Sequence, residues 1–241
     1  MREIVLDTET TGFDPESGDR IVEIGAIELH NHVPTGETYH QYINPQRSMP
    51  QEAFEVHGIG PDLLDPPQKP SAGAVTLKDK PVFAKIGQAF RDFVGDAKLV
   101  IHNAAFDMKF LNAELRWMGI RELAPDQAVD TLAIARRRFP GSPASLDALC
   151  RRFGIDNSSR TLHGALLDSE ILAEVYLELI GGRQPDLVLA AADNRATGSN
   201  AEDWRAVPRK HSLPPRISEQ EKAAHAAFVE QLGENALWNR S

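Results

Sequence analysis

Apolar side chains in the N-terminal part of the chain follow the two-residue period of a half-buried sheet. The stretch from Ile4 to Gly12 is an apolar run that carries two acids near its end and then breaks into a turn. Residues 20–29 alternate apolar and polar side chains, so we predict a second strand that runs antiparallel to the first. After a turn region at 31–37, residues 38–43 predict a third strand. These patterns indicate a sheet that begins with an antiparallel meander.

Later parts of the chain show the three- to four-residue spacing of apolar side chains that is typical of helices packed on a sheet. One such run spans residues 83–93, and two strand-to-helix passages follow, through 99–111 and from Asp130. Residues 61–81, rich in Pro, Lys and Asp, are interpreted as an exposed insertion. A short helix or turn is predicted at 50–59. Further helices are predicted at 145–153, with Ser145 as a candidate cap, and from Leu166 onward. The fold class is therefore α/β.

Composition restricts the class of protein but does not indicate a function. The chain has 241 residues, 41% of them hydrophobic and 25% charged, as expected for one sizeable domain plus an appendage. The single cysteine, Cys150, excludes an intramolecular disulfide and falls in a helical apolar pattern, so we expect a buried free thiol. Neither a membrane span nor a signal peptide is predicted, so we expect a cytoplasmic protein. The net charge of −9 argues against a broad, non-specific grip on nucleic-acid backbone.

The first strand carries the first candidate for chemistry. Asp7 and Glu9 are two residues apart, so on a strand their carboxylates point to the same face. Like charges at one spot repel unless a cation lies between them, and hard oxygen ligands suit Mg²⁺ or Mn²⁺ better than zinc. The alternative is an edge strand with both acids facing solvent. Glu23 is the one acid of the second strand that we single out as a further candidate, although a surface or capping role is the favoured interpretation.

Two further stretches place acids and histidines where a strand ends or a helix begins. His102 and Asn103 end an apolar strand, and Asp107 lies in the first turn of the helix that follows. This junction is well placed to face the first strand, although Asp107 also fits a helix-start acid that interacts with the dipole. His163 precedes a helix that carries Asp168. The two can share a site only if His163 stands in the loop before the helix, where it can act as a general base; a surface histidine is the alternative.

Three motifs together resemble a known family. They are Asp7-Thr8-Glu9-Thr10-Thr11-Gly12, His102-Asn103-Ala104-Ala105-Phe106-Asp107 and His163-Gly164-Ala165-Leu166-Leu167-Asp168. In order and spacing they resemble the motifs of the DEDDh 3′→5′ exonucleases. The longer sequence segments around the motifs are similar to those of proofreading subunits of replicative DNA polymerases. The resemblance covers roughly residues 1–180. It implies a ribonuclease H-like fold, with a mixed central sheet and helices on both faces.

The resemblance also implies a site and a reaction. Asp7, Glu9, Asp107 and Asp168 would hold two divalent ions, Mg²⁺ or Mn²⁺, and His163 would take the proton of the attacking water. The expected products are deoxynucleoside 5′-monophosphates released from single-stranded or frayed 3′ DNA ends. The insertion at 61–81 is longer than expected in the family. The residues expected to contact the substrate are Asp7, Glu9, Thr10, Thr11, Glu52, His57, His102, Asn103 and Asp168.

The C-terminal part predicts a tethered subunit. We divide the chain into an exonuclease domain at 1–182, a flexible linker at 183–217 and a polymerase-binding segment at 218–241. The last segment opens with a capping-box pattern and continues as an amphipathic helix too short to be stable alone in water. By resemblance it binds the catalytic (alpha) subunit of the polymerase; docking on its own domain is the alternative. Gln184 to Leu189 resembles a sliding-clamp-binding peptide, a kind of motif that is frequent by chance.

Two other functions remain open at this point. A standalone DEDDh nuclease that acts on RNA or DNA 3′ ends has the same motifs, although the long tail argues against it. A non-catalytic scaffold of a replicase is disfavoured, because a scaffold does not need four acids and a histidine in this order.

Overall fold

A computed structural model describes residues 1–71, 73–158, 160, 162–182 and 217–232. Contacts within the chain divide it into two units, residues 1–187 and 188–241, which are described separately below. Most of the linker and the whole of the clamp-binding peptide predicted at Gln184 to Leu189 lie outside the described residues.

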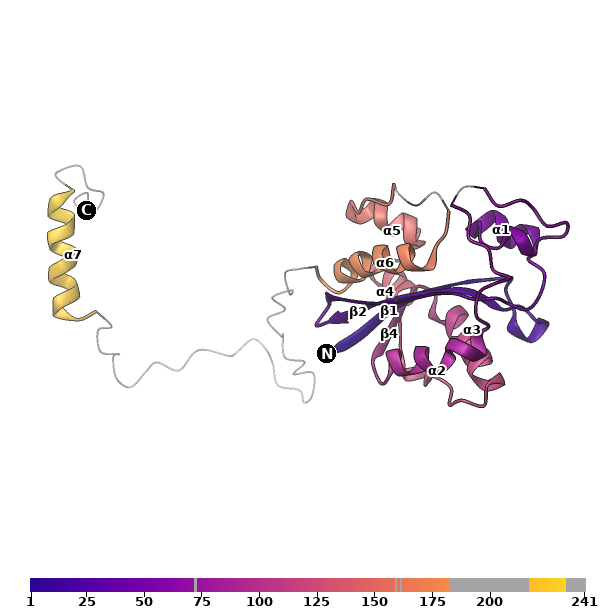
Figure 1. Ribbon diagram of the computed structural model, residues 1–241. Coiled ribbons are helices and arrows are strands. Elements are labelled where there is room, and N and C mark those ends of the chain that lie inside the picture. Colours follow the sequence, from indigo (N-terminus) through magenta and orange to yellow (C-terminus); the bar gives the residue numbers. More distant parts are fainter. Residues whose placement is uncertain (72, 159, 161, 183–216, 233–241) are drawn as a thin grey trace, which may run out of the picture. The chain divides into compact units, whose positions relative to one another are not determined.

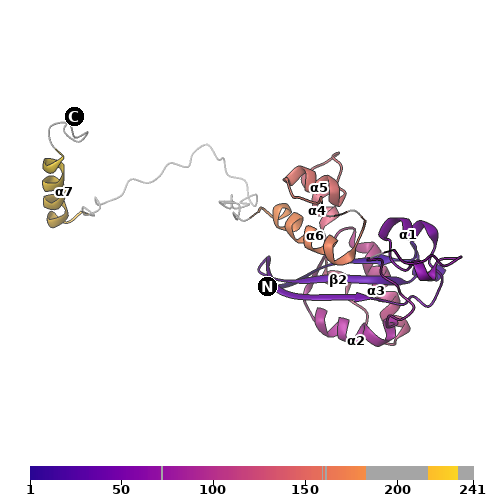
Figure 2. The ribbon, with the colours of Figure 1, turned by 45° about the horizontal axis from the view of Figure 1, so that its top comes forward.

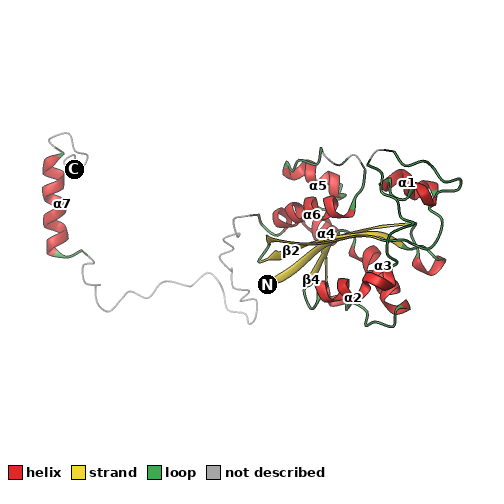
Figure 3. Cartoon of the chain, in the orientation of Figure 1, coloured by secondary structure: helices red, strands yellow, loops and turns green. Residues whose placement is uncertain are grey.

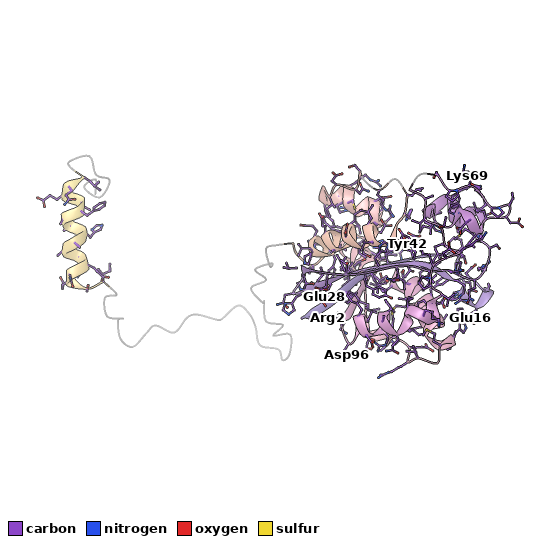
Figure 4. All side chains as sticks on the ribbon, in the orientation of Figure 1. Arg2, Glu16, Glu28, Tyr42, Lys69 and Asp96 are labelled. Atoms are coloured by element: carbon purple, nitrogen blue, oxygen red, sulfur yellow. The ribbon has the colours of Figure 1, made fainter. Side chains whose placement is uncertain are left out.

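The first unit is built on a five-stranded sheet in the order β3-β2-β1-β4-β5. Figure 3 shows its strands in yellow among the red helices. Strands β1 and β2 pair antiparallel, as do β2 and β3, whereas β4 and β5 run parallel to β1. At the end of the sheet near the N-terminus, Arg2 of β1 forms an ion pair with Glu28 of β2 (Figure 4). The strands are β1 (Arg2–Thr10), β2 (Ile21–His30), β3 (Val33–Tyr42), β4 (Lys98–Ile101) and β5 (Ala128–Asp130).

Helices cover both faces of this sheet (Figures 1 and 2). On one face, α2 (Phe83–Val94) and α3 (Ala104–Trp117) pack on the even-numbered apolar residues of β1. On the other face, α6 (Ala165–Leu179) packs on the odd-numbered ones, and α4 (Thr131–Arg138) and α5 (Leu146–Phe153) lie against α6. The predicted mixed α/β sheet with helices on both faces is confirmed.

The third strand begins earlier than predicted. Residues 31–37 were expected to form a turn, but only Asn31 and His32 lie in the connection, both with positive φ, and β3 starts at Val33. Its first six residues are exposed at the sheet edge, so the apolar alternation that marks a half-buried strand is missing there.

Residues 61–81 are only partly exposed, which corrects their interpretation as an exposed insertion. After α1 (Gln51–His57) and the short 3-10 helix η2 (Pro61–Leu63), Leu64 and Leu77 are buried in a small apolar cluster. The carboxylate of Asp62 accepts the backbone N–H groups of Leu77 and Lys78. Two well-spaced leucines are too weak a pattern to predict this packing from sequence.

Two more 3-10 helices, η1 (Pro15–Ser17) and η3 (Pro125–Gln127), connect elements of the first unit. In the second unit, α7 (Glu219–Gln231) begins with the predicted capping box between Ser218 and Glu221. Cys150 is buried and free, as predicted. Among the described residues, no helix is long and apolar enough to cross a membrane.

Candidate active site

The site is built where β1 and β4 end. These strands are parallel, with Val5 opposite Val100, so their carboxyl ends meet at one edge of the sheet, the usual place for ligands in α/β proteins. Asp7 and Glu9 alternate with the apolar residues of β1 and lie opposite Gly25 and Glu23 of β2. Both acids therefore face α6, on the same side of the sheet.

Asp107 reaches the same edge from α3. It lies in the first turn of the helix, is only 3% exposed, and accepts a hydrogen bond of 2.7 Å from Thr8 Oγ1. The helix begins after Asn103, which has a φ of +68° and whose N–H donates to Asp130 at 3.2 Å. This sharp reversal at the end of β4 brings the third acid beside β1.

Asp168 and His163 come from the start of α6. His163 stands in the loop before the helix, as the sequence predicts, and its backbone N–H donates to the carbonyl of Val56 in α1 at 3.2 Å. Its Nδ1 lies 3.4 Å from Oδ2 of Asp168, which is buried, whereas the imidazole is about half exposed. A histidine held beside an acid and open to solvent can exchange a proton with a bound water.

Arg160 is a cation inside this group of acids, and the sequence analysis passed over it. Its side chain is 9% exposed, and its guanidinium donates to both carboxylate oxygens of Asp168. It also contacts His163 Nδ1 at 2.7 Å and Asp147 at 2.8 Å. Its position three residues before the histidine was the available signal, but that spacing has no meaning unless the loop folds back on the helix.

The electrostatics show how closely the acids lie. Burial raises the pKa of Asp7 well above its usual range, although part of its surface stays accessible, and repulsion from Asp107 and Glu9 adds to this. Burial and the neighbouring Glu23 raise the pKa of Glu9 to about 8. Burial raises the pKa of Asp107 to about 7. For Asp168, burial acts in the same direction, but His163 and Arg160 outweigh it and leave the pKa lowered.

This arrangement fits divalent cations. Carboxylates that repel one another, and whose pKa values are therefore raised, are stabilised most by a bound ion with charge +2. Among the described residues, ligand atoms of Glu9, His163 and Asp168 lie within 4.8 Å of one another. Asp7 belongs to the same electrostatic group, since both Asp107 and Asp168 raise its pKa.

Two cavities meet at this group. A cavity of about 430 Å³ is lined by Asp7, His102, Arg160, His163 and Asp168, among others. A larger one of about 610 Å³ begins at Glu9 and extends between β1 and α1. Its lining includes Thr10, Thr11, Glu52 and His57 together with the apolar side chains of Phe13, Val56 and Phe106.

Of the residues predicted to contact substrate, most line these cavities, but their surroundings differ. Thr10 and Thr11 are buried, and Glu52 is exposed at the rim. Burial lowers the pKa of His102, whose Nδ1 lies 3.0 Å from Thr131 Oγ1. Asn103 is exposed, and its role in the structure is the backbone reversal before α3.

Two residues are more deeply buried than their positions in the sequence suggest. His57, taken alone, reads as a surface histidine, but it is 5% exposed, its Nδ1 accepts the N–H of Ile59, and burial lowers its pKa to about 4. Glu23 is 2% exposed, so a surface role is wrong; its carboxylate accepts the N–H of Ala165, which is a capping role.

Comparisons with known proteins agree with this geometry. A family model described as Exonuclease (RNase_T) matches residues 4–176. The fold resembles Escherichia coli Exonuclease I bound to a dT13 oligonucleotide, with a TM-score of 0.60, 20% identity and coverage of 76% of this chain and 42% of that one. It also resembles the nuclease domain of 3′hExo, a DEDDh family member bound to rAMP, with a TM-score of 0.56, 19% identity and coverage of 74% and 91%. The chain is thus an exonuclease of the ribonuclease H-like fold.

More similar relatives narrow the family. DNA polymerase III subunit epsilon of Escherichia coli is 41% identical over 98% of this chain and 97% of its own length. The protein of the same name from Rickettsia typhi is 45% identical over 96% and 97%. The chain belongs to the family of DNA polymerase III epsilon subunits.

Proposed function

We propose that this protein hydrolyses the terminal phosphodiester of single-stranded or frayed 3′ DNA ends and so proofreads for DNA polymerase III. The observation that carries the proposal is the meeting of acids from β1, α3 and α6, with a solvent-accessible histidine beside them. Membership of the epsilon family supports it. A cytoplasmic location fits this role.

Asp7, Glu9, Asp107 and Asp168 would hold the divalent ions, for which we propose two Mg²⁺ or Mn²⁺. Bound ions of this kind lower the pKa of a water molecule and stabilise the attacking and leaving oxygens of a phosphodiester. The donor set is made of carboxylates, which suits these hard cations. Asp168 would exchange its contact with Arg160 for a ligand bond, and the freed guanidinium would then be available to bind a substrate phosphate.

His163 would accept the proton of the attacking water. The hydrogen bond from its backbone to Val56 and the contact with Asp168 hold the imidazole at the edge of the site while leaving about half of it open to solvent. Asp168, whose Oδ2 lies 3.4 Å from Nδ1 of His163, would stabilise the positive charge that the ring acquires.

The cavity between β1 and α1 would hold the terminal nucleotide. Its volume of about 610 Å³ is in the range of small-molecule sites, and Phe13, Val56 and Phe106 offer apolar walls for a base. Thr10, Thr11 and Glu52 line the same cavity and would supply polar atoms for the sugar. With its pKa lowered to about 4, His57 is neutral at physiological pH, so it would contact the nucleotide as a neutral ring.

Mismatch selectivity needs no reading of the base by this pocket. A mismatched terminus is already partly unpaired, so moving it into a site for single strands costs less than melting a paired end. The net charge of −9 is consistent with delivery of the end by a polymerase rather than by tight binding of duplex DNA.

The second unit would provide the tether. On α7, Phe228 is 56% and Leu232 is 46% exposed, so an apolar surface is available for the catalytic (alpha) subunit of the polymerase. Leu237 and Trp238, which extend the predicted binding segment, lie outside the described residues. Sliding-clamp binding through Gln184 to Leu189 stays a prediction.

The test is digestion of a primer–template with a mismatched or a paired 3′ terminus, with and without the polymerase catalytic subunit, in Mg²⁺. We expect faster release of deoxynucleoside monophosphates from the mismatch, and loss of release in Asp7→Ala and His163→Ala. Asp126→Asn, a change at an exposed acid, is the matched control and keeps activity. Full activity of Asp7→Ala, or preference for an RNA oligomer of the same sequence, would overturn the proposal.

A further inference from the structure

Glu23 is a buried carboxylate on β2 whose position the hydrolytic reaction alone does not explain. It is 2% exposed and lies directly opposite Glu9 in the β1–β2 register. Acids that face each other on neighbouring strands repel. A carboxylate at this position therefore costs stability in the metal-free protein, and a compensating role is expected.

The contacts of Glu23 indicate that role. Its Oε2 accepts the backbone N–H of Ala165, the first residue of α6, at 3.0 Å. The first N–H groups of a helix have no partner within the helix, and Gly164 at the N-cap position has no side chain to offer. A negative charge there also interacts favourably with the helix dipole. Glu23 thus supplies from a distant strand the cap that the helix's own sequence lacks.

The same end of α6 is held against β2 at two further points. A Cβ at Gly25 would lie 2.1 Å from the backbone nitrogen of Leu166, so only glycine permits this approach. Ser169 Oγ donates to the carbonyl of Gly25 at 2.9 Å. Glu23 is itself fixed, because its Oε1 lies 2.7 Å from Nε2 of His40 on β3.

We infer that Glu23 is a positioning residue of the exonuclease site, which fixes the N-terminus of α6 relative to β1. His163 lies two residues before the capped N–H and Asp168 three residues after it. A shift of this helix start would separate both from Asp7 and Glu9, and small misplacements of reacting groups have large effects on rate. The inference rests on the proposed function, since it concerns the same site.

The test compares three variants of the full chain. Glu23→Met keeps the volume but removes the acceptor, whereas Glu23→Gln keeps an oxygen for the N–H of Ala165 and removes only the charge. Glu3→Gln is the matched control. Glu3 is a fully buried acid on β1, on the face of the sheet that α6 covers, and its carboxylate accepts a hydrogen bond from the hydroxyl of Tyr176 near the other end of α6. For each, Mn²⁺ binding is measured by calorimetry, kcat and KM on a single-stranded DNA oligonucleotide, and Tm by thermal unfolding.

We expect Glu23→Met to bind Mn²⁺ at least tenfold more weakly and to lose at least tenfold in kcat, with KM within twofold. Glu23→Gln should stay within threefold of the wild type in Mn²⁺ affinity and in kcat. Glu3→Gln should lower only Tm. Wild-type Mn²⁺ affinity and kcat in Glu23→Met would overturn the inference, as would equal losses in the Met and Gln variants, which would assign the effect to charge.

One further variant covers poor folding of Glu23→Met. Ser169→Ala removes the second anchor of the same helix start, and we expect about threefold weaker Mn²⁺ binding; unchanged binding would count against the inference. If the wild type itself neither binds Mn²⁺ nor degrades DNA, the proposed function fails, whereas an active wild type with an unaffected Glu23→Met contradicts only the role of Glu23.

Discussion

The clustered acids predict how the stability of the metal-free protein depends on pH. An acid whose pKa is higher in the folded than in the unfolded protein costs stability once the pH exceeds the unfolded value, and the cost is complete above the folded value. For Glu9 these values are 4.5 and about 8. For Asp107 they are 3.8 and about 7. Stability should therefore fall as the pH rises from about 4 to 8.

The size of the effect follows from the shift. One pKa unit corresponds to about 1.4 kcal/mol, so the Glu9 carboxyl alone accounts for a loss of about 5 kcal/mol across this range. Asp107 and Glu9 share neighbours and do not titrate independently, so we expect a joint loss on the order of 5 kcal/mol rather than the sum of two separate losses. A divalent ion that binds only the folded protein, at a free concentration of 100 times its Kd, raises the free energy of unfolding by about 2.7 kcal/mol.

The assay is urea unfolding in a chelator at pH 5, 6, 7 and 8, repeated with saturating Mn²⁺. We expect the free energy of unfolding to fall with pH in the chelator, and Mn²⁺ to stabilise more at pH 8 than at pH 5. Glu9→Gln removes one of the titrating groups and should flatten the slope, whereas Asp126→Asn should not change it. A metal-free stability that is constant or rises between pH 5 and 8 would refute the reasoning.

Three other predictions concern single contacts. Arg160→Met removes the cation from Asp168, so Mn²⁺ binding followed by calorimetry should require a higher pH; an unchanged pH midpoint would contradict this role. Gly25→Ala forces a Cβ against the backbone of Leu166 and should destabilise by about 3 kcal/mol in urea unfolding, so a neutral result would rule out the close approach. Ser145→Ala removes the α5 cap and should cost about 1 kcal/mol in the same assay; no loss would mean that the cap does not form in solution.

Local patterns were sufficient for much of the fold, whereas the choice of the four acids also needed the resemblance of three motifs to the DEDDh exonucleases. The two-residue period places Asp7 and Glu9 on one face of a strand, and the 100° turn of a helix requires His163 to lie outside α6; the structure has both features. These inferences need only the geometry of a single element.

Residues whose roles depend on distant partners were missed or only partly predicted. Glu23 binds a backbone group 142 positions away, and nothing near it in the sequence indicates that partner. Arg160 acts only because its loop folds back on α6. His57 looks like a surface residue in a short helix, but tertiary contacts leave it only 5% exposed. Tertiary contacts, not local patterns, decide such positions.

The central claim is that acids from three distant segments form one site for two divalent ions. Anomalous diffraction from crystals soaked in Mn²⁺ tests it most directly, because it locates the ions without relying on activity. We predict two Mn²⁺ peaks bound by Asp7, Glu9, Asp107 and Asp168, with Arg160 withdrawn from Asp168. Crystals that bind no Mn²⁺ at these four carboxylates, or that bind it only elsewhere on the protein, would contradict the account.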